Sequence, residues 1–147
     1  MKLAKALKYK NRLVKKISTV QRSISSYNSV EKGSTKEVDV SLAMGEYKKF
    51  IKELVELKIK MFEASRPIRE HILKLAELKA EISWLREIPT LRGQARVSSY
   101  MRDDGEAVEY EAVFSRQEIN KMIEDNEEQI DSLQEEIDTF NHTTEID

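Results

Sequence analysis

The side chains best suited to metal binding or acid–base chemistry are two histidines, His71 and His142, and a carboxylate cluster at 124–128. A metal site needs several ligands that converge on one point. Neither histidine stands in the Glu-x-x-His pattern of di-iron bundles, and the carboxylates lack the Asp-x-Asp-x-Asp-Gly spacing of a calcium loop. We therefore expect no metal site in this chain.

The sequence also lacks the familiar motifs of catalysis. It holds no Gly-rich phosphate loop, no nucleophile elbow and no Ser/His/Asp set. The absence of cysteine excludes disulfides and thiolate chemistry. The sequence therefore predicts a protein with no catalytic residues and no cofactor, which is not an enzyme.

Charge is distributed unevenly, although the formal net charge is only −2. Residues 1–22 carry eight basic side chains and no acid, whereas residues 116–140 carry nine acids and two bases. A basic helix can bind nucleic-acid phosphates or an anionic lipid surface. Alternatively, the basic and acidic segments pair with each other, within one chain or between two. We favour this pairing, and anion binding by the first helix remains the alternative.

The composition is typical of long amphipathic helices, because 35% of the residues are charged and there are only four glycines and two prolines. Apolar residues recur at steps of three and four in four segments. These steps predict helices at about 1–26, 40–64, 66–88 and 116–140. Asp39 or Ser41 is expected to cap the second helix, and Ser115 with Glu118 forms a capping box for the last. The fold class predicted is mainly α: a single domain, 1–147, with four helices in an antiparallel bundle or coiled coil.

The apolar pattern continues through Ser65–Pro67 without losing its phase. Proline inside a helix removes a hydrogen bond and clashes with the preceding turn. Two interpretations follow: one kinked helix from about 40 to 88, or a new helix capped by Ser65 with Pro67 in its first turn. We favour the break.

Three polar residues interrupt the apolar pattern of the helices: Lys10, His71 and Asn126. A buried polar residue in a helical seam selects the alignment and the partner number that satisfy it. These residues are therefore candidates for fixing register and assembly. The alternative is a partly exposed position at a helix end, which suits Lys10 because its stem can reach solvent.

A β-hairpin is expected at about 95–114, before the last helix, because two alternating segments flank Asp104-Gly105. A two-residue turn there would place Met101 opposite Val108 and Ser99 opposite Tyr110. The apolar residues of one face would be Val97, Met101, Val108, Tyr110, Ala112 and Phe114. A lone hairpin is only marginally stable in water, so this face should pack on the bundle or on a second chain.

Several segments occur together in a known order: MKLAKAL at the start, SVEKG at 29–33, ISWLREI at 82–88, the hairpin, and Asn-His-Thr-Thr-Glu at 141–145. In this the chain resembles the small helical bacterial proteins of the septicolysin family. It departs from the family in a shorter connection at Ala64–Pro67, and in His142 where an aromatic Trp is frequent. The resemblance implies a helix break at Ser65–Pro67. It also implies a shared tail, whose candidate residues are Asn141, His142, Thr143, Thr144 and Glu145; these would otherwise form a C-terminal cap on the bundle.

The function expected is that of a non-enzymatic helical interaction or assembly protein, whose partner is expected to be a second copy of itself. The first alternative is an anion-binding protein that uses the basic first helix, and the second is a cytolysin-like toxin, which rests on the family name alone. MKLAKALKYK lacks the apolar core of a secretory signal, and no apolar run is long enough to span a bilayer. We therefore expect a cytoplasmic protein.

Overall fold

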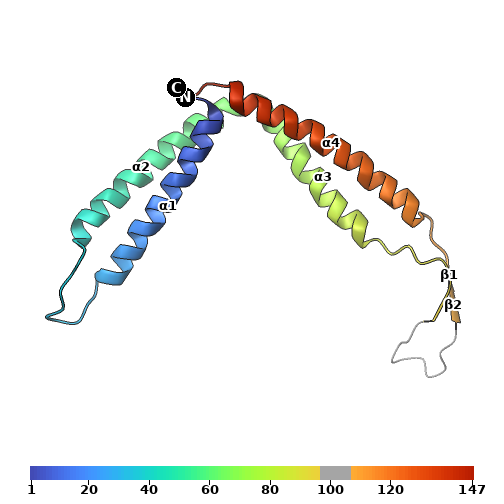
Figure 1. Cartoon of the computed structure of the whole chain (residues 1–147), viewed down its shortest axis with the longest axis horizontal. Coiled ribbons are helices and arrows are strands. Elements are labelled where there is room, and N and C mark those ends of the chain that lie inside the picture. Colours follow the sequence, from blue (N-terminus) through green and yellow to red (C-terminus); the bar gives the residue numbers. More distant parts are fainter. Residues whose placement is uncertain (97–106) are drawn as a thin grey trace. The chain divides into compact units, whose positions relative to one another are not determined.

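The computed structural model describes residues 1–96 and 107–147 (Figure 1). The elements in chain order are α1 (Leu3–Tyr27), α2 (Val40–Ala64), the 3-10 helix η1 (Arg66–Ile68), α3 (Arg69–Glu87), β1 (Gly93–Arg96), β2 (Ala107–Tyr110) and α4 (Arg116–Thr143). The predicted fold class is confirmed: the protein is mainly α, with four helices and an antiparallel two-stranded hairpin before the last. The helices pack as antiparallel pairs, which fits a bundle.

The chain divides into two compact units, which we describe separately. Unit 1 comprises Met1–Arg69 with Ile137–Asp147, and unit 2 comprises Glu70–Glu136. Helix α4 contributes its last turns to unit 1 and the rest to unit 2.

Unit 1 is the antiparallel pair of α1 and α2, closed by the C-terminal segment (Figure 1). Two buried clusters hold the pair together along its length. One consists of Leu13, Ile17 and Leu54, and the other of Leu3, Ala6, Leu57 and Ile146. The predicted three- and four-residue steps therefore place these α1 residues in the core.

Unit 2 is built on α3 and residues 116–136 of α4, and it has one buried cluster. This cluster consists of Ile82, Leu85, Ile119 and Ile123, from the C-terminal half of α3 and the N-terminal turns of α4. Arg116 joins the two helix ends, because its guanidinium donates to the Ile88 carbonyl (2.9 Å) and to Thr90 Oγ1 (3.1 Å). The basic residue in the first turn of α4 is explained by this contact.

Two of the helix starts are capped as their sequences predict. Asp39 Oδ1 accepts from the Leu42 N–H (3.1 Å) at the start of α2, so Asp39 rather than Ser41 is the cap. At the start of α4 the Glu118 N–H donates to Ser115 Oγ (3.1 Å), and the Ser115 N–H donates to Glu118 Oε2 (2.9 Å). This reciprocal pair is the capping box.

The α-helix is interrupted after Ala64, and a single 3-10 turn that contains Pro67 separates α2 from α3. Ser65 stands at the N-cap position of this turn, and its carbonyl accepts from the Ile68 N–H (3.1 Å), but its hydroxyl makes no capping hydrogen bond to the turn. Instead, Ser65 Oγ donates back to the Phe62 carbonyl (3.1 Å), one of the carbonyls that the end of α2 leaves unpaired. Arg69 donates to the same carbonyl and lies over the Phe62 ring, 3.4 Å from its centroid.

The hairpin is present, but the predicted register is wrong. Tyr110 pairs with Gly93 rather than Ser99, and Val108 pairs with Ala95 rather than Met101. Arg92 also joins the base of the hairpin, where its guanidinium donates to the Ala112 carbonyl (3.4 Å).

The expected packing face of the hairpin is only partly observed. Val108 and Tyr110 are half-buried, one residue apart on β2. Phe114 lies beyond the strand and is exposed. Val97 and Met101 lie outside the described residues.

Candidate functional site

Helix α3 carries an exposed row of apolar residues that we call the apolar stripe. It consists of Leu73, Ala76, Ala80 and Trp84, all of them exposed, at steps of three, four and four residues. Leu73 is 67% exposed and Trp84 60%. Because a helix turns by about 100° per residue, these residues share one face, opposite Ile82 and Leu85, which pack on α4.

An open groove of about 600 Å³ lies beside the apolar stripe, between α3 and α4. Its apolar lining comes from Leu73, Leu78 and Leu133, and its polar lining includes Lys74, Glu77 and Glu81. The groove exists because the buried cluster of unit 2 lies toward the opposite ends of the two helices. Apolar surface of this kind is typical of a site where another helix binds.

Asn126 is the buried polar residue of the α4 seam, at 8% exposure. Its Nδ2 is enclosed and has no hydrogen-bond partner among the described residues. An unpaired buried amide destabilises a fold by about 1–3 kcal/mol. A buried Asn in a helical seam can nevertheless be retained, because it favours one register of the packed helices over the others.

The other two register candidates have different surroundings. His71 Nε2 lies 2.6 Å from Glu136 Oε2 on α4, and its Nδ1 is enclosed without a partner among the described residues. Lys10 is half-buried and forms no ion pair with the residues that the structure describes. His71 therefore has a polar partner within unit 2, and Lys10 has none in unit 1.

Helix α1 presents a row of cations that we call the basic stripe: Lys5, Lys8, Arg12 and Lys15. All four are exposed, and none forms an ion pair with a described residue. Lys5, Lys8 and Arg12 line a hollow of about 170 Å³ together with Met1 and Tyr9. Lys16 is engaged elsewhere, because its Nζ lies 5.8 Å from the centroid of the Phe50 ring.

Helix α4 presents a corresponding row of carboxylates that we call the acidic stripe: Glu124, Glu128, Asp131 and Glu135. These residues are exposed and form no ion pair within residues 1–96 and 107–147. Neighbouring acids do have partners, since Asp125 binds Lys121 (3.0 Å) and Glu127 lies 3.5 Å from Arg86. The pair with Asp125 raises the pKa of Lys121.

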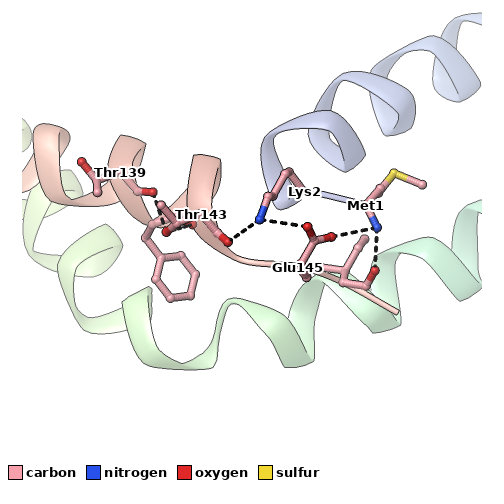
Figure 2. Close-up of polar contacts among 7 residues, drawn as sticks. Met1, Lys2, Thr139, Thr143 and Glu145 are labelled. Carbon is pink, nitrogen blue, oxygen red and sulfur yellow. Dashed lines mark hydrogen bonds and ion pairs between the residues drawn. The ribbon is translucent and has the colours of Figure 1, made fainter.

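The C-terminal segment, proposed as a shared tail, binds the start of α1 within unit 1 (Figure 2). Lys2 Nζ contacts Glu145 Oε1 (2.8 Å) and the Thr143 carbonyl (2.9 Å), and the Met1 amine lies 3.2 Å from Glu145 Oε2. Backbone bonds run from the Leu3 N–H to the Thr144 carbonyl and from the Ile146 N–H to the Met1 carbonyl, both 2.8 Å. Hydrogen bonds from Lys2 and from the Met1 amine lower the pKa of Glu145.

Other tail residues hydrogen-bond within the last turns of α4. His142 Nδ1 lies 2.7 Å from the Asp138 carbonyl, and Thr143 Oγ1 donates to the Thr139 carbonyl (2.9 Å). Asn141 is half-buried. The tail contacts of His142 and Thr143 are therefore local to α4, whereas those of Glu145 and Ile146 join the two ends of unit 1.

The apolar stripe of α3 was not found from the sequence. One apolar seam per segment is enough to predict a helix, and in the third helix that seam contains the buried Ile82 and Leu85. The signal was present nevertheless, because Leu73, Ala76, Ala80 and Trp84 repeat at the same steps one face away.

Comparisons with models of protein families, with curated proteins and with solved structures gave no match. Within the two described ranges, the His, Asp and Glu side chains form no group of three that could hold a metal ion. None of the helices in the described part of the chain combines the length and the apolarity that crossing a membrane requires.

Proposed function

We propose that this protein is a non-enzymatic assembly protein that binds a second copy of itself through the apolar stripe of α3. The observation that carries the proposal is the stripe itself: apolar side chains at helical spacing, exposed to water on the face that α4 does not cover. Burying a side chain of the size of leucine contributes about 1.5–3 kcal/mol. In a two-fold contact each residue of the stripe is buried once in each copy, so its contribution counts twice.

The stripe is self-complementary in an antiparallel arrangement of two α3 helices. Leu73 of one copy then lies opposite Trp84 of the other, so the large residues meet at the two ends. Ala76 lies opposite Ala80, and two small residues allow the helices to approach closely. A contact between two identical surfaces related by a two-fold axis requires such self-complementarity.

The charged neighbours of the stripe favour the same partner. Lys74 of one copy lies opposite Glu81 of the other in the antiparallel arrangement. Lys74 is held by an exposed pair with Glu70 (2.8 Å), which is weak enough to be exchanged. The groove beside Leu73 gives the Trp84 ring of the second copy an apolar surface to enter.

The test is sedimentation velocity over a range of protein concentrations, together with the emission of Trp84, the only tryptophan in the chain. We expect the mass to rise with concentration and the emission to shift to shorter wavelength as Trp84 leaves water. Leu73→Glu should weaken association at least about tenfold, because it places a charge in the contact twice.

The matched control is Leu42→Glu on α2, since Leu42 is 70% exposed and lies in unit 1. This variant should associate like the wild type. A wild type that stays monomeric, with unshifted Trp84 emission at every concentration, would overturn the proposal.

A further inference from the structure

We infer that a second contact joins copies of this chain: the basic stripe of α1 binds the acidic stripe of α4 in another copy. The inference rests on the proposed self-association, but it uses different elements. On α4 it also uses a different face, because Glu128 and Glu135 lie across the helix from Leu133, which lines the groove.

The two stripes match in number, spacing and length. The cations on α1 follow steps of three, four and three residues, and the carboxylates on α4 follow steps of four, three and four. At a rise of about 1.5 Å per residue, the stripes are about 15 and 17 Å long. Two helices side by side can therefore bring all four cations against all four carboxylates.

None of the eight side chains forms an ion pair within the described residues, although other charged residues nearby do. Glu124 and Glu128 act on Lys121 only at longer range, where they help to raise its pKa. Each stripe is exposed, so each can be reached by a second molecule. The hollow bordered by Lys5, Lys8 and Arg12 gives a carboxylate a place among three cations at once.

The charges of the two units favour the same partner. Unit 1 contains 17 basic and 10 acidic residues, whereas unit 2 contains 8 basic and 17 acidic residues. A polyanion such as nucleic acid is attracted by unit 1 and repelled by unit 2, whereas a second copy offers each unit its opposite. The basic stripe also carries no aromatic residue on which a base could stack; Tyr9 is half-buried and donates to Glu53.

Charge reversal on each stripe tests the contact. We expect Lys5→Glu/Arg12→Glu to weaken self-association at least about tenfold at about 50 mM salt, and Glu128→Lys/Glu135→Lys to do the same. Both losses should shrink at about 500 mM salt, where the charges are screened. The readout is the dissociation constant from sedimentation of the full-length chain.

Mixing the two variants is the decisive measurement. In the mixture the α1 stripe of one variant, now acidic, can bind the α4 stripe of the other variant, now basic. The second contact joins the two stripes that carry their native charges. We therefore expect the mixture to associate about as tightly as the wild type, while each variant alone does not. The control is Lys48→Glu/Lys58→Glu, which reverses two exposed cations of α2 that lack an ion pair in the described structure and should leave association unchanged.

The outcomes separate this inference from the proposed function. If the wild type associates and Leu73→Glu disrupts it, but neither charge reversal has an effect, the stripe contact is wrong and the proposed function stands. If the wild type never associates, the proposed function fails. If the α1 reversal alone weakens association or abolishes retention on a phosphate-rich polymer, and mixing restores nothing, the basic stripe serves a polyanion and the inference is overturned.

Discussion

The two units use the same element, an antiparallel helix pair, but they differ in the number and placement of their buried clusters. Unit 1 has two buried clusters along α1 and α2, and its C-terminal residues fasten the ends of the pair. Unit 2 has one cluster, with an open groove farther along the same helices and an apolar stripe exposed on α3. A helix pair on its own can cover only one face of each helix, and in unit 1 the tail supplies what is missing at one end. In unit 2 no described residue closes the helix ends in this way. Unit 1 also leaves apolar side chains exposed, since Val55, Ile59 and Phe62 on α2 are 51%, 59% and 59% exposed, so the two units differ in their number of buried clusters and in how their ends are closed.

The largest effect is expected from matched core truncations, one in each unit. Leu13 and Ile119 are both 1% exposed, and Leu13→Ala or Ile119→Ala should cost about 2–5 kcal/mol in stability. The consequences should differ, because Ile119 belongs to the single cluster of unit 2 whereas unit 1 has a second cluster around Leu57. Amide hydrogen exchange should show protection lost throughout 116–136 in Ile119→Ala, but kept near Leu57 in Leu13→Ala.

This comparison is contradicted if Ile119→Ala lowers protection in α1 as strongly as it does in α4. That result would mean that the two units unfold as one, and that the difference in their cores has no energetic meaning. Val14→Ala is the control, because Val14 is exposed on α1 and its truncation removes little buried apolar surface.

A smaller effect of opposite sign is expected at Asn126. Replacing Asn126 by Leu removes a buried amide whose Nδ2 is unpaired, so unit 2 should gain about 1–3 kcal/mol in urea unfolding. The gain should come with a loss of specificity, seen as more than one assembly state in sedimentation, because a seam without polar residues accepts several alignments. Asn120→Leu, at an exposed position of the same helix, should change neither quantity.

Much of this fold could be predicted from local patterns, and the helix limits show why. The predicted limits differ from the observed ones by no more than three residues, and the starts of α2 and α4 match because local caps mark them: Asp39 and the Ser115–Glu118 pair. The hairpin register was not predictable in this way. The observed pairing places Tyr110 opposite Gly93, which is six positions earlier than the Asp104-Gly105 turn motif predicts, and a turn motif alone does not define how many residues the connection contains.

The candidate site was harder to predict for a related reason. The sequence identified the opposite charges of the two end helices, but it could not say which charges find a partner locally. Asp125 and Glu127 do, while Glu128 and Glu135 form no ion pair within the described structure, and the sequence alone does not distinguish the two cases. The stripe on α3 was overlooked because Leu73 and Trp84 lie outside the seam that explains the helix.

The smallest effect is expected at the tail that fastens unit 1, and it depends on pH. Hydrogen bonds from Lys2 and the Met1 amine lower the pKa of Glu145, so the folded state binds a proton there less readily than the unfolded chain. The stabilisation is therefore complete above the ordinary glutamate pKa of about 4.3, and it is lost as the pH falls through the lower folded value. Glu145→Gln should lower the thermal midpoint slightly at neutral pH, and the difference from the wild type should vanish in acid.

The matched control for that measurement is Glu63→Gln, an exposed glutamate of α2 that lacks an ion pair in the described structure, and it should show no such pH dependence. The pair of Glu70 with Lys74 also lowers a glutamate pKa, but it is present in every variant and cancels in the difference. Exchange of the Leu3 and Ile146 amides localises the effect, since both donate across the joined ends. If Glu145→Gln leaves these two amides as protected as before at neutral pH, the backbone bonds and the burial of Ile146 hold the tail without the carboxylate. The attachment of the C-terminal tail to α1 would then depend on apolar burial and backbone hydrogen bonds, and not on the charge of Glu145.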